Sequence, residues 1–102
     1  MREPIQFPIG RGFDRAYWLS RCRGFLVQDG DGMRIGTVVE LHYRSRLDQP
    51  DELAVRAGRF GHRLLIYRTE AVRTILPSEA RLVLAAGASP IRTGRQRSDD
   101  AA

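Results

Sequence analysis

The stretch GFLVQDGDGMRIGTVVELHY at residues 24–43 decides the fold of this chain. Two apolar runs flank DGDG at 29–32, and Asp and Gly accept the positive φ that a tight turn between antiparallel strands requires. The run after the turn alternates between apolar and polar residues, as a strand with one buried face does. The stretch therefore predicts a β-hairpin with strands over 25–27 and 34–43. One face of the second strand would carry Ile35, Thr37, Val39, Leu41 and Tyr43.

One residue breaks this alternation. Val38 is apolar, yet it would lie on the polar face of a regular strand, and Gly36 stands two positions before it. A phase error beside a glycine indicates a β-bulge or a sharp bend, which small barrels use to curve their strands. We therefore expect the long strand to bend near Gly36.

Further strand-like runs follow, separated by polar or glycine-containing turns. They span 53–57, 63–67 and 81–85. The run RLLIY at 63–67 is dense in apolar residues, so we expect this strand to be central and buried on both faces. Several short strands joined by such turns are typical of an all-β sandwich or barrel.

Two short helical segments are predicted beside the strands. Asp14 would cap a helix over 15–22, which ends before Gly24. Thr69 would cap a single helical turn before the last strand, and Pro77 would end it. The apolar residues that this turn presents to the core are Val72, Ile75 and Leu76.

Composition divides the chain into three parts. Residues 1–13 contain Pro and Gly without periodicity and are expected to form a flexible lead-in. Residues 14–86 hold the predicted strands, and residues 87–102 have the Gly, Ser, Pro, Arg and Asp content of a disordered tail. We expect an all-β fold, a small barrel of five to six strands with a short N-terminal helix and a one-turn helix before the last strand.

The order of these runs resembles the PRC-barrel family. This SH3-like β-barrel occurs in the photosynthetic reaction-centre H subunit and in the C-terminal half of a ribosome maturation factor. The resemblance covers about residues 18–84 and rests on hydrophobic spacing, in Val27, the acidic-glycine turn, IGTV at 35–38, LAV at 53–55, LLI at 64–66, Val72 to Ile75, Pro77 and LVL at 82–84. It implies a domain that docks onto partners, and it implies no active-site residues.

The turns contain glycines at spacings that occur in ligand-binding loops. Asp29 and Asp31 begin like a calcium loop, but Arg34 stands where that loop requires glycine. Gly58 and Gly61 have the GxxG spacing of KH-type RNA-binding domains, but predicted strands flank them where KH domains have helices. Both segments are therefore predicted to be hairpin turns.

Histidine and cysteine are too few and too far apart to indicate a metal site. His42 and His62 are the only histidines, and Cys22 is the only cysteine. Cys22 lies between two arginines, which lower a thiol pKa, but a small buried residue is the more common role of a free cysteine. We expect no catalytic residue, no cofactor and no metal ion.

The lone cysteine excludes an intrachain disulfide, which fits a reducing compartment. The first residues lack the apolar segment of a signal peptide, and no apolar run is long enough to span a bilayer. We therefore expect a cytoplasmic protein without membrane insertion.

The net charge is +5, and all of the basic residues are arginines. Basicity suggests a nucleic-acid partner, but the charge is spread along the chain rather than gathered into a basic arm. The absence of lysine, with many Ala, Gly and Arg, also fits a base-composition bias of the coding genome. Charge alone leaves the class of partner open.

Three hypotheses about function remain. An enzyme with an unrecognised site is disfavoured, because the sequence shows no partnered nucleophile and no acid–base pair. The favoured hypothesis is a non-enzymatic module that docks a partner protein or a second copy of itself, as in a homodimer. The small core is one reason for this hypothesis, because association stabilises domains of this size. The alternative is an RNA- or ribosome-associated module, in which outward arginines lie near Phe60 and Tyr43. Those two rings serve equally well as plugs of the barrel. The arginines predicted to bind RNA are Arg34, Arg44, Arg46, Arg56 and Arg59.

Overall fold

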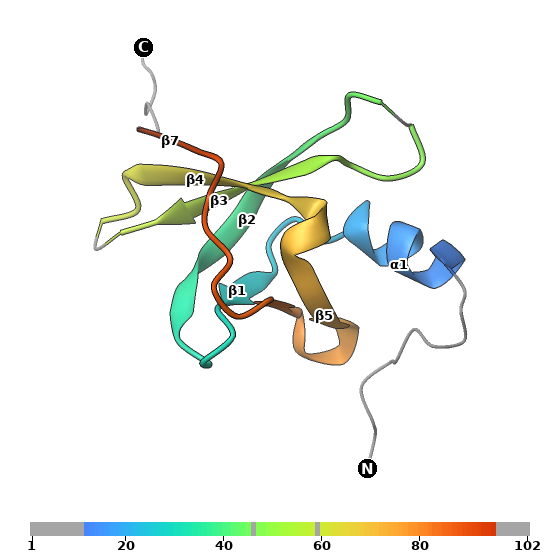
Figure 1. The fold of residues 1–102 in the computed structure, drawn as a ribbon, viewed down its shortest axis with the longest axis horizontal. Helices are drawn as coiled ribbons and strands as arrows, with labels where there is room; N and C mark the ends of the chain where they lie inside the picture. The colour runs from blue at the N-terminus through green and yellow to red at the C-terminus, as the bar shows by residue number, and fades with distance from the viewer. Residues whose placement is uncertain (1–11, 46, 59, 96–102) are drawn as a thin grey trace.

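One seven-stranded mixed sheet forms most of the computed structural model, which describes residues 12–45, 47–58 and 60–95 (Figure 1). The predicted all-β class is confirmed. The sheet has the order β5-β6-β1-β2-β3-β4-β7. The elements are α1 (Gly12–Leu19), β1 (Leu26–Gln28), β2 (Arg34–His42), β3 (Glu52–Ala57), β4 (Arg63–Arg68), β5 (Val72–Leu76), β6 (Arg81–Leu84) and β7 (Arg92–Arg95), with 3-10 helices at Thr69–Ala71 and Pro77–Glu79.

The predicted hairpin is confirmed. β1 and β2 pair antiparallel, with Leu26 opposite Thr37. The Asp29 carboxylate accepts hydrogen bonds from the backbone N–H groups of Asp31 (2.8 Å) and Met33 (2.9 Å), and Gly32 has a φ of +87°. The DGDG sequence is thus a turn held by its own aspartate, which is the usual role of Asp in turns.

β2 carries two bulges, where one was predicted near Gly36. On the β1 side, Val27 lies opposite Gly36 and Gln28 opposite Arg34, so Ile35 is the extra residue. On the β3 side, Val38 lies opposite Val55 and Glu40 opposite Ala54, which makes Val39 a second extra residue. The predicted single apolar face is therefore wrong for the first half of β2, since the bulges change which residues point inward.

The inward residues of β2 follow from these bulges. Val38 is 1% exposed, opposite the fully buried Val55, and Leu41 lies opposite the fully buried Leu53. Gly36 sits where β3 leaves β2 no room for a side chain, because a Cβ atom there would lie 2.1 Å from the carbonyl oxygen of Arg56. Only glycine fits that contact without movement of the backbone.

The predicted helical turn after Thr69 is wrong beyond Ala71. A 3-10 turn covers Thr69–Ala71, and β5 (Val72–Leu76) follows where no strand was predicted. The Thr69 hydroxyl does not cap a helix but donates to the carbonyl of Pro50 (3.1 Å). A bulge after Val72 places both Val72 and Ile75 in the core, opposite Leu84 and Leu82. That three-residue spacing is the one that a helix also produces.

The predicted disorder from residue 87 onward is contradicted for residues 87–95. β7 (Arg92–Arg95) pairs antiparallel with β4, and the N–H of Ile91 donates to the carbonyl of Ile66 (2.7 Å). β4 is thereby paired on both sides, and its residues 65–67 are buried, as predicted. Residues 1–11 of the predicted lead-in and residues 96–102 of the predicted tail lie outside the described residues.

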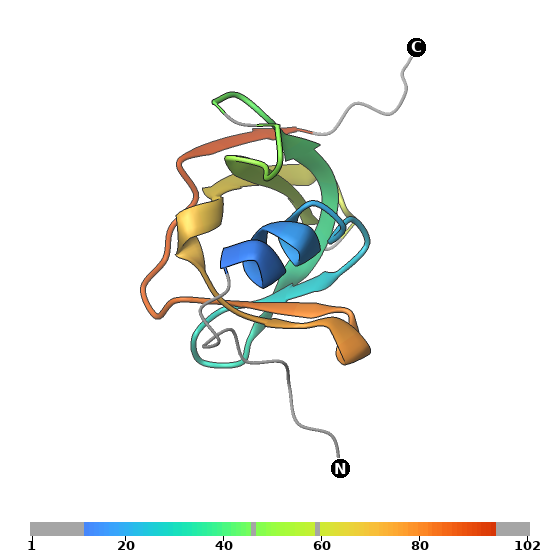
Figure 2. The same cartoon turned by 90° about the vertical axis from the view of Figure 1, so that its right-hand side faces the viewer.

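The helix α1 covers one end of the curled sheet (Figure 2). It begins at Gly12 and ends at Leu19, three residues before the predicted end. Leu19 and Cys22 are fully buried, and both belong to the same core as Val27 and Leu53. Arg15 donates to the carbonyls of Thr69 (2.9 Å) and Val72 (3.0 Å), which ties α1 to the start of β5.

The close contact at Gly36 predicts a specific loss of stability. Gly36→Ala should lower the free energy of unfolding by about 1–3 kcal/mol, since the new methyl group meets the backbone of Arg56. Gly94→Ala in β7 is the control, because a Cβ atom there meets nothing within 4 Å. Urea unfolding followed by circular dichroism measures both. Equal effects of the two substitutions would contradict this account of Gly36.

Candidate functional site

Of the five arginines predicted to bind RNA, the three that the structure describes do not form one surface. Arg34 and Arg56 are exposed and line a common groove. Arg44 lies beyond the other end of β2, a nine-residue strand with a length of roughly 26 Å. It donates to the Glu52 carboxylate at 3.3 Å. Arg46 and Arg59 lie outside the described residues.

The first candidate site, here called the arginine groove, lies at the start of β2 beside the β3–β4 turn. It is open, has a volume of about 580 Å³, and is lined by Arg34, Ile35, Gly36, Thr37, Arg56, Ala57, Gly58 and Gly61. Phe60, in the same turn, is 76% exposed, and its ring centroid lies 6.1 Å from that of His62. The prediction that GxxG joins two strands is confirmed by the positions of β3 and β4.

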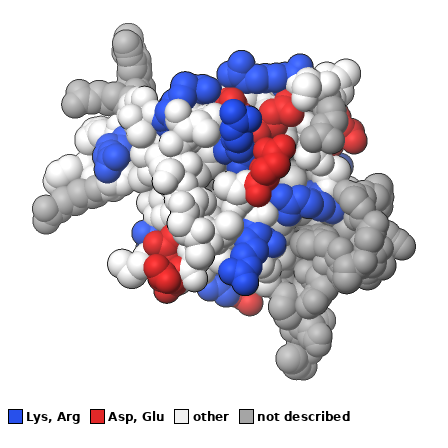
Figure 3. All heavy atoms as spheres, in the orientation of Figure 1, with Lys and Arg blue, Asp and Glu red and all other residues white. Residues whose placement is uncertain are grey.

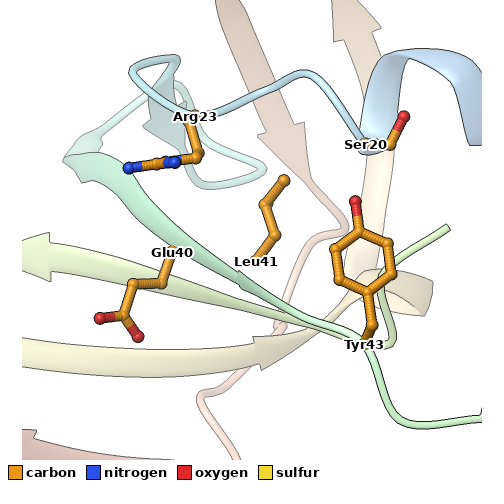
Figure 4. A pocket seen from close by; sticks show the side chains of 5 residues that line it. All are labelled: Ser20, Arg23, Glu40, Leu41 and Tyr43. Atoms are coloured by element: carbon orange, nitrogen blue, oxygen red, sulfur yellow. The ribbon is translucent and has the colours of Figure 1, made fainter. Parts of the chain in front are cut away.

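The second candidate site, here called the α1–β2 groove, lies between the turn after α1 and the end of β2. It has a volume of about 410 Å³ and is lined by Ser20, Arg23, Glu40, Leu41 and Tyr43 (Figure 4). Leu41 and Tyr43 project from β2 toward the α1 side, with the Tyr43 hydroxyl directed toward Ser20, while Glu40 projects the other way. Tyr43 is 40% exposed, so it is not a plug of the core.

Backbone hydrogen bonds fix the two walls of the α1–β2 groove to each other. The N–H of Gly24 donates to the carbonyl of Val38 (2.8 Å), and the N–H of Val38 donates to the carbonyl of Phe25 (3.0 Å). Arg23 is the residue before this ladder, and Glu40 comes directly after the bulge at Val39. Both walls are therefore positioned by the sheet rather than by free loops.

Aromatic residues of α1 precede this groove in the chain. The rings of Tyr17 and Trp18 meet edge to face with centroids 5.0 Å apart, and the Arg21 guanidinium lies 3.9 Å from the centre of the Tyr17 ring. Tyr17 is 41% exposed, and Trp18 packs partly against the core. Tyr, Trp and Arg are the residue types enriched at the centres of protein interfaces.

A buried carboxylate joins β7 to the rest of the sheet. Glu52, 8% exposed, accepts hydrogen bonds from Arg92 at 2.8 and 3.4 Å and from Arg44 at 3.3 Å, and His42 lies 3.4 Å away. The Arg92 hydrogen bond holds the pKa of Glu52 below its usual value of 4.5, although burial acts in the opposite direction.

Acidic atoms also lie between basic ones on the face in Figure 3, so that face has no continuous basic area.

Cys22 is a buried packing residue, as predicted. Its thiol donates to the carbonyl of Leu19 (3.2 Å), and burial raises its pKa to about 12. Since the thiolate is the reactive form, the raised pKa lowers the reactivity of Cys22 at neutral pH. Among residues 12–45, 47–58 and 60–95, no group of three His, Cys, Asp or Glu side chains could hold a metal ion.

Over the same described residues, no helix is long and apolar enough to cross a membrane.

Sequence reasoning named Tyr43, Arg34 and Arg56 but missed the α1–β2 groove as a unit. Ser20 and Arg23 are separated from Glu40 by a turn and a whole strand, and no motif links them. The groove depends on the pairing of residues 24–25 with Val38, which local spacing does not reveal.

No protein-family model matches the chain, and a search of curated proteins finds no match either. The resemblance to the PRC-barrel family therefore stays a prediction.

The Glu52 cluster predicts a pH-dependent contribution to stability. A lowered pKa in the folded state means that the ionised carboxylate stabilises the fold above pH 4.5, and that this contribution is lost as the pH falls through the lower folded value. Glu52→Gln should therefore cost about 1–3 kcal/mol at pH 7 and progressively less at lower pH.

Chemical unfolding of both proteins between pH 7 and pH 3 measures this difference. Glu79→Gln is the control, because Glu79 pairs with Arg81 in a partly exposed position and should change stability by no more than about 0.5 kcal/mol. A Glu52→Gln difference that stays constant across the pH range would show that the carboxylate's charge does not contribute.

Proposed function

We propose that this chain is a non-enzymatic interaction module that docks a protein through the α1–β2 groove. The observation that carries the proposal is the composition of this groove on a rigid frame. Arg23, Leu41 and Tyr43 offer a cation, an aliphatic surface and a half-exposed aromatic ring within one hollow. Interface centres combine these residue types, and pre-positioned anchors lose little conformational entropy on binding.

The charges of the groove suggest the chemistry of the partner. Arg23 is exposed, and no ion pair joins it to another residue in the described part of the chain. Glu40, by contrast, lies 3.0 Å from His42 and points away from the groove centre. A complementary partner therefore presents an acidic side chain to Arg23 and an apolar side chain to Leu41 and Tyr43. The partner is a second protein or a second copy of this chain.

The hydroxyl and thiol groups near the groove support a non-enzymatic role. Ser20 donates to the carbonyl of Tyr17 (2.8 Å), and its oxygen accepts from Arg21 (3.1 Å), so no general base among the described residues takes its proton. Cys22 is buried, and burial raises the pKa of its thiol, which disfavours the reactive thiolate. A buried, unpaired cysteine fits a reducing compartment, and we place the module in the cytoplasm on that basis.

Substitution of the groove anchors tests the proposal. With the wild-type chain as bait in a lysate of the source cells, one protein should be recovered in stoichiometric amount, or the chain should form dimers in sedimentation equilibrium. Arg23→Glu and Tyr43→Ser should each weaken the association about tenfold or more, since loss of one interface anchor costs at least 1–2 kcal/mol.

Arg73→Glu is the matched control, because it makes the same charge change at an exposed position on β5. Its association should equal that of the wild-type chain. Equal loss in Arg23→Glu and Arg73→Glu would assign the effect to net charge, and a monomer that captures no partner would overturn the proposal.

A further inference from the structure

We propose that the arginine groove binds single-stranded nucleic acid, with phosphates on Arg34 and Arg56 and a base on Phe60. This site is distinct from the α1–β2 groove: it lies at the first residues of β2, whereas the α1–β2 groove lies at the last ones. The proposal does not depend on protein docking.

Unpaired cations are the first reason. No hydrogen bond or ion pair joins the guanidinium of Arg34 or Arg56 to another residue among those that the structure describes. Arg44, Arg81 and Arg92, in contrast, each bond to a carboxylate. Two exposed arginines that share one hollow repel each other, and a phosphodiester backbone would neutralise both.

Packing against the β3–β4 turn orients one of the two cations, Arg56, in advance. The side chain of Arg56 lies along the β3–β4 turn, with its Cδ atom 3.3 Å from the position that a Cβ atom of Gly61 would occupy. Gly36, Gly58 and Gly61 contribute only backbone to the groove. The space beside Gly36 and Gly61 is filled by the carbonyl and the side chain of Arg56, so these glycines let Arg56 pack closely against the wall of the groove.

An exposed aromatic ring lies in the β3–β4 turn, whose residues Gly58 and Gly61 line the groove. Phe60 is 76% exposed at the tip of the turn, and His62 lies next to it with a ring tilt of 45°. A single exposed ring is ordinary on protein surfaces. Beside two unpaired guanidinium groups, however, it completes the combination of stacking surface and positive groove by which proteins bind unpaired nucleotides. Stacking requires free bases, so the ligand is a single strand rather than a duplex.

Fluorescence anisotropy with a labelled 12-nucleotide oligouridine tests the proposal. Affinity should fall as salt rises, and Arg34→Ala or Arg56→Ala should each reduce the salt dependence by about one phosphate contact. Phe60→Ala should weaken binding about fivefold or more, with a smaller effect on the salt dependence. An oligomer of the same sequence made as DNA shows whether the groove prefers single-stranded RNA or single-stranded DNA, and tighter binding of either one supports the site.

Two variants serve as controls. Arg73→Ala removes an exposed arginine on β5, and Tyr43→Ser removes an anchor of the α1–β2 groove. Both should bind the oligomer like the wild-type chain, and circular dichroism should show every variant folded. No binding at 50 mM salt, equal weakening by Arg73→Ala, or tighter binding of a duplex or of an acidic peptide would each overturn the proposal.

Discussion

The extra residue at Val39 in β2 is the constraint on which both faces of the sheet depend. With Val38 inward, a regular strand would place Glu40 and His42 in the core and turn Leu41 outward. One inserted residue reverses this order. Leu41 then packs opposite Leu53, while Glu40 and His42 lie on the outer face with Glu52. A charge cluster inside the core would cost several kcal/mol per unpaired ion, so the bulge is needed for the fold itself.

The same bulge links the core to the surface. Because Leu41 lies inward, Tyr43 two residues later points to the same side and forms a wall of the α1–β2 groove. On the outer face, Glu52 holds Arg92 and thereby the edge strand β7. One local irregularity in β2 thus positions an aromatic anchor on one side and an ion pair on the other. A register slip of one residue would remove both at once.

The sequence predicted β1 to β4 and β6, because each of these strands has alternating apolar residues or a dense apolar run. It did not indicate β5 or β7, for two different reasons. In β5 the bulge after Val72 gives its core residues the three-residue spacing of a helix. The sequence of β7, RTGR, has no apolar pattern. The strand is instead held by backbone pairing with β4 and by the bond between Arg92 and Glu52. Tertiary partners supply these two strands with the stability that local sequence lacks.

The arginines show why composition indicated a class of partner without locating a site. Arg15 bonds to backbone carbonyls, and Arg81 and Arg92 bond to carboxylates, so these three residues hold elements together. Arg34 and Arg56 have the same sequence character but no such bond among the described residues, and they share a groove. A guanidinium already bonded to protein acceptors gains little from a phosphate, because it must first give up those bonds. Once the bonded arginines are set aside, Arg34 and Arg56 stand out because two unbonded guanidinium groups line one groove, whereas Arg23 is the single arginine that lines the α1–β2 groove.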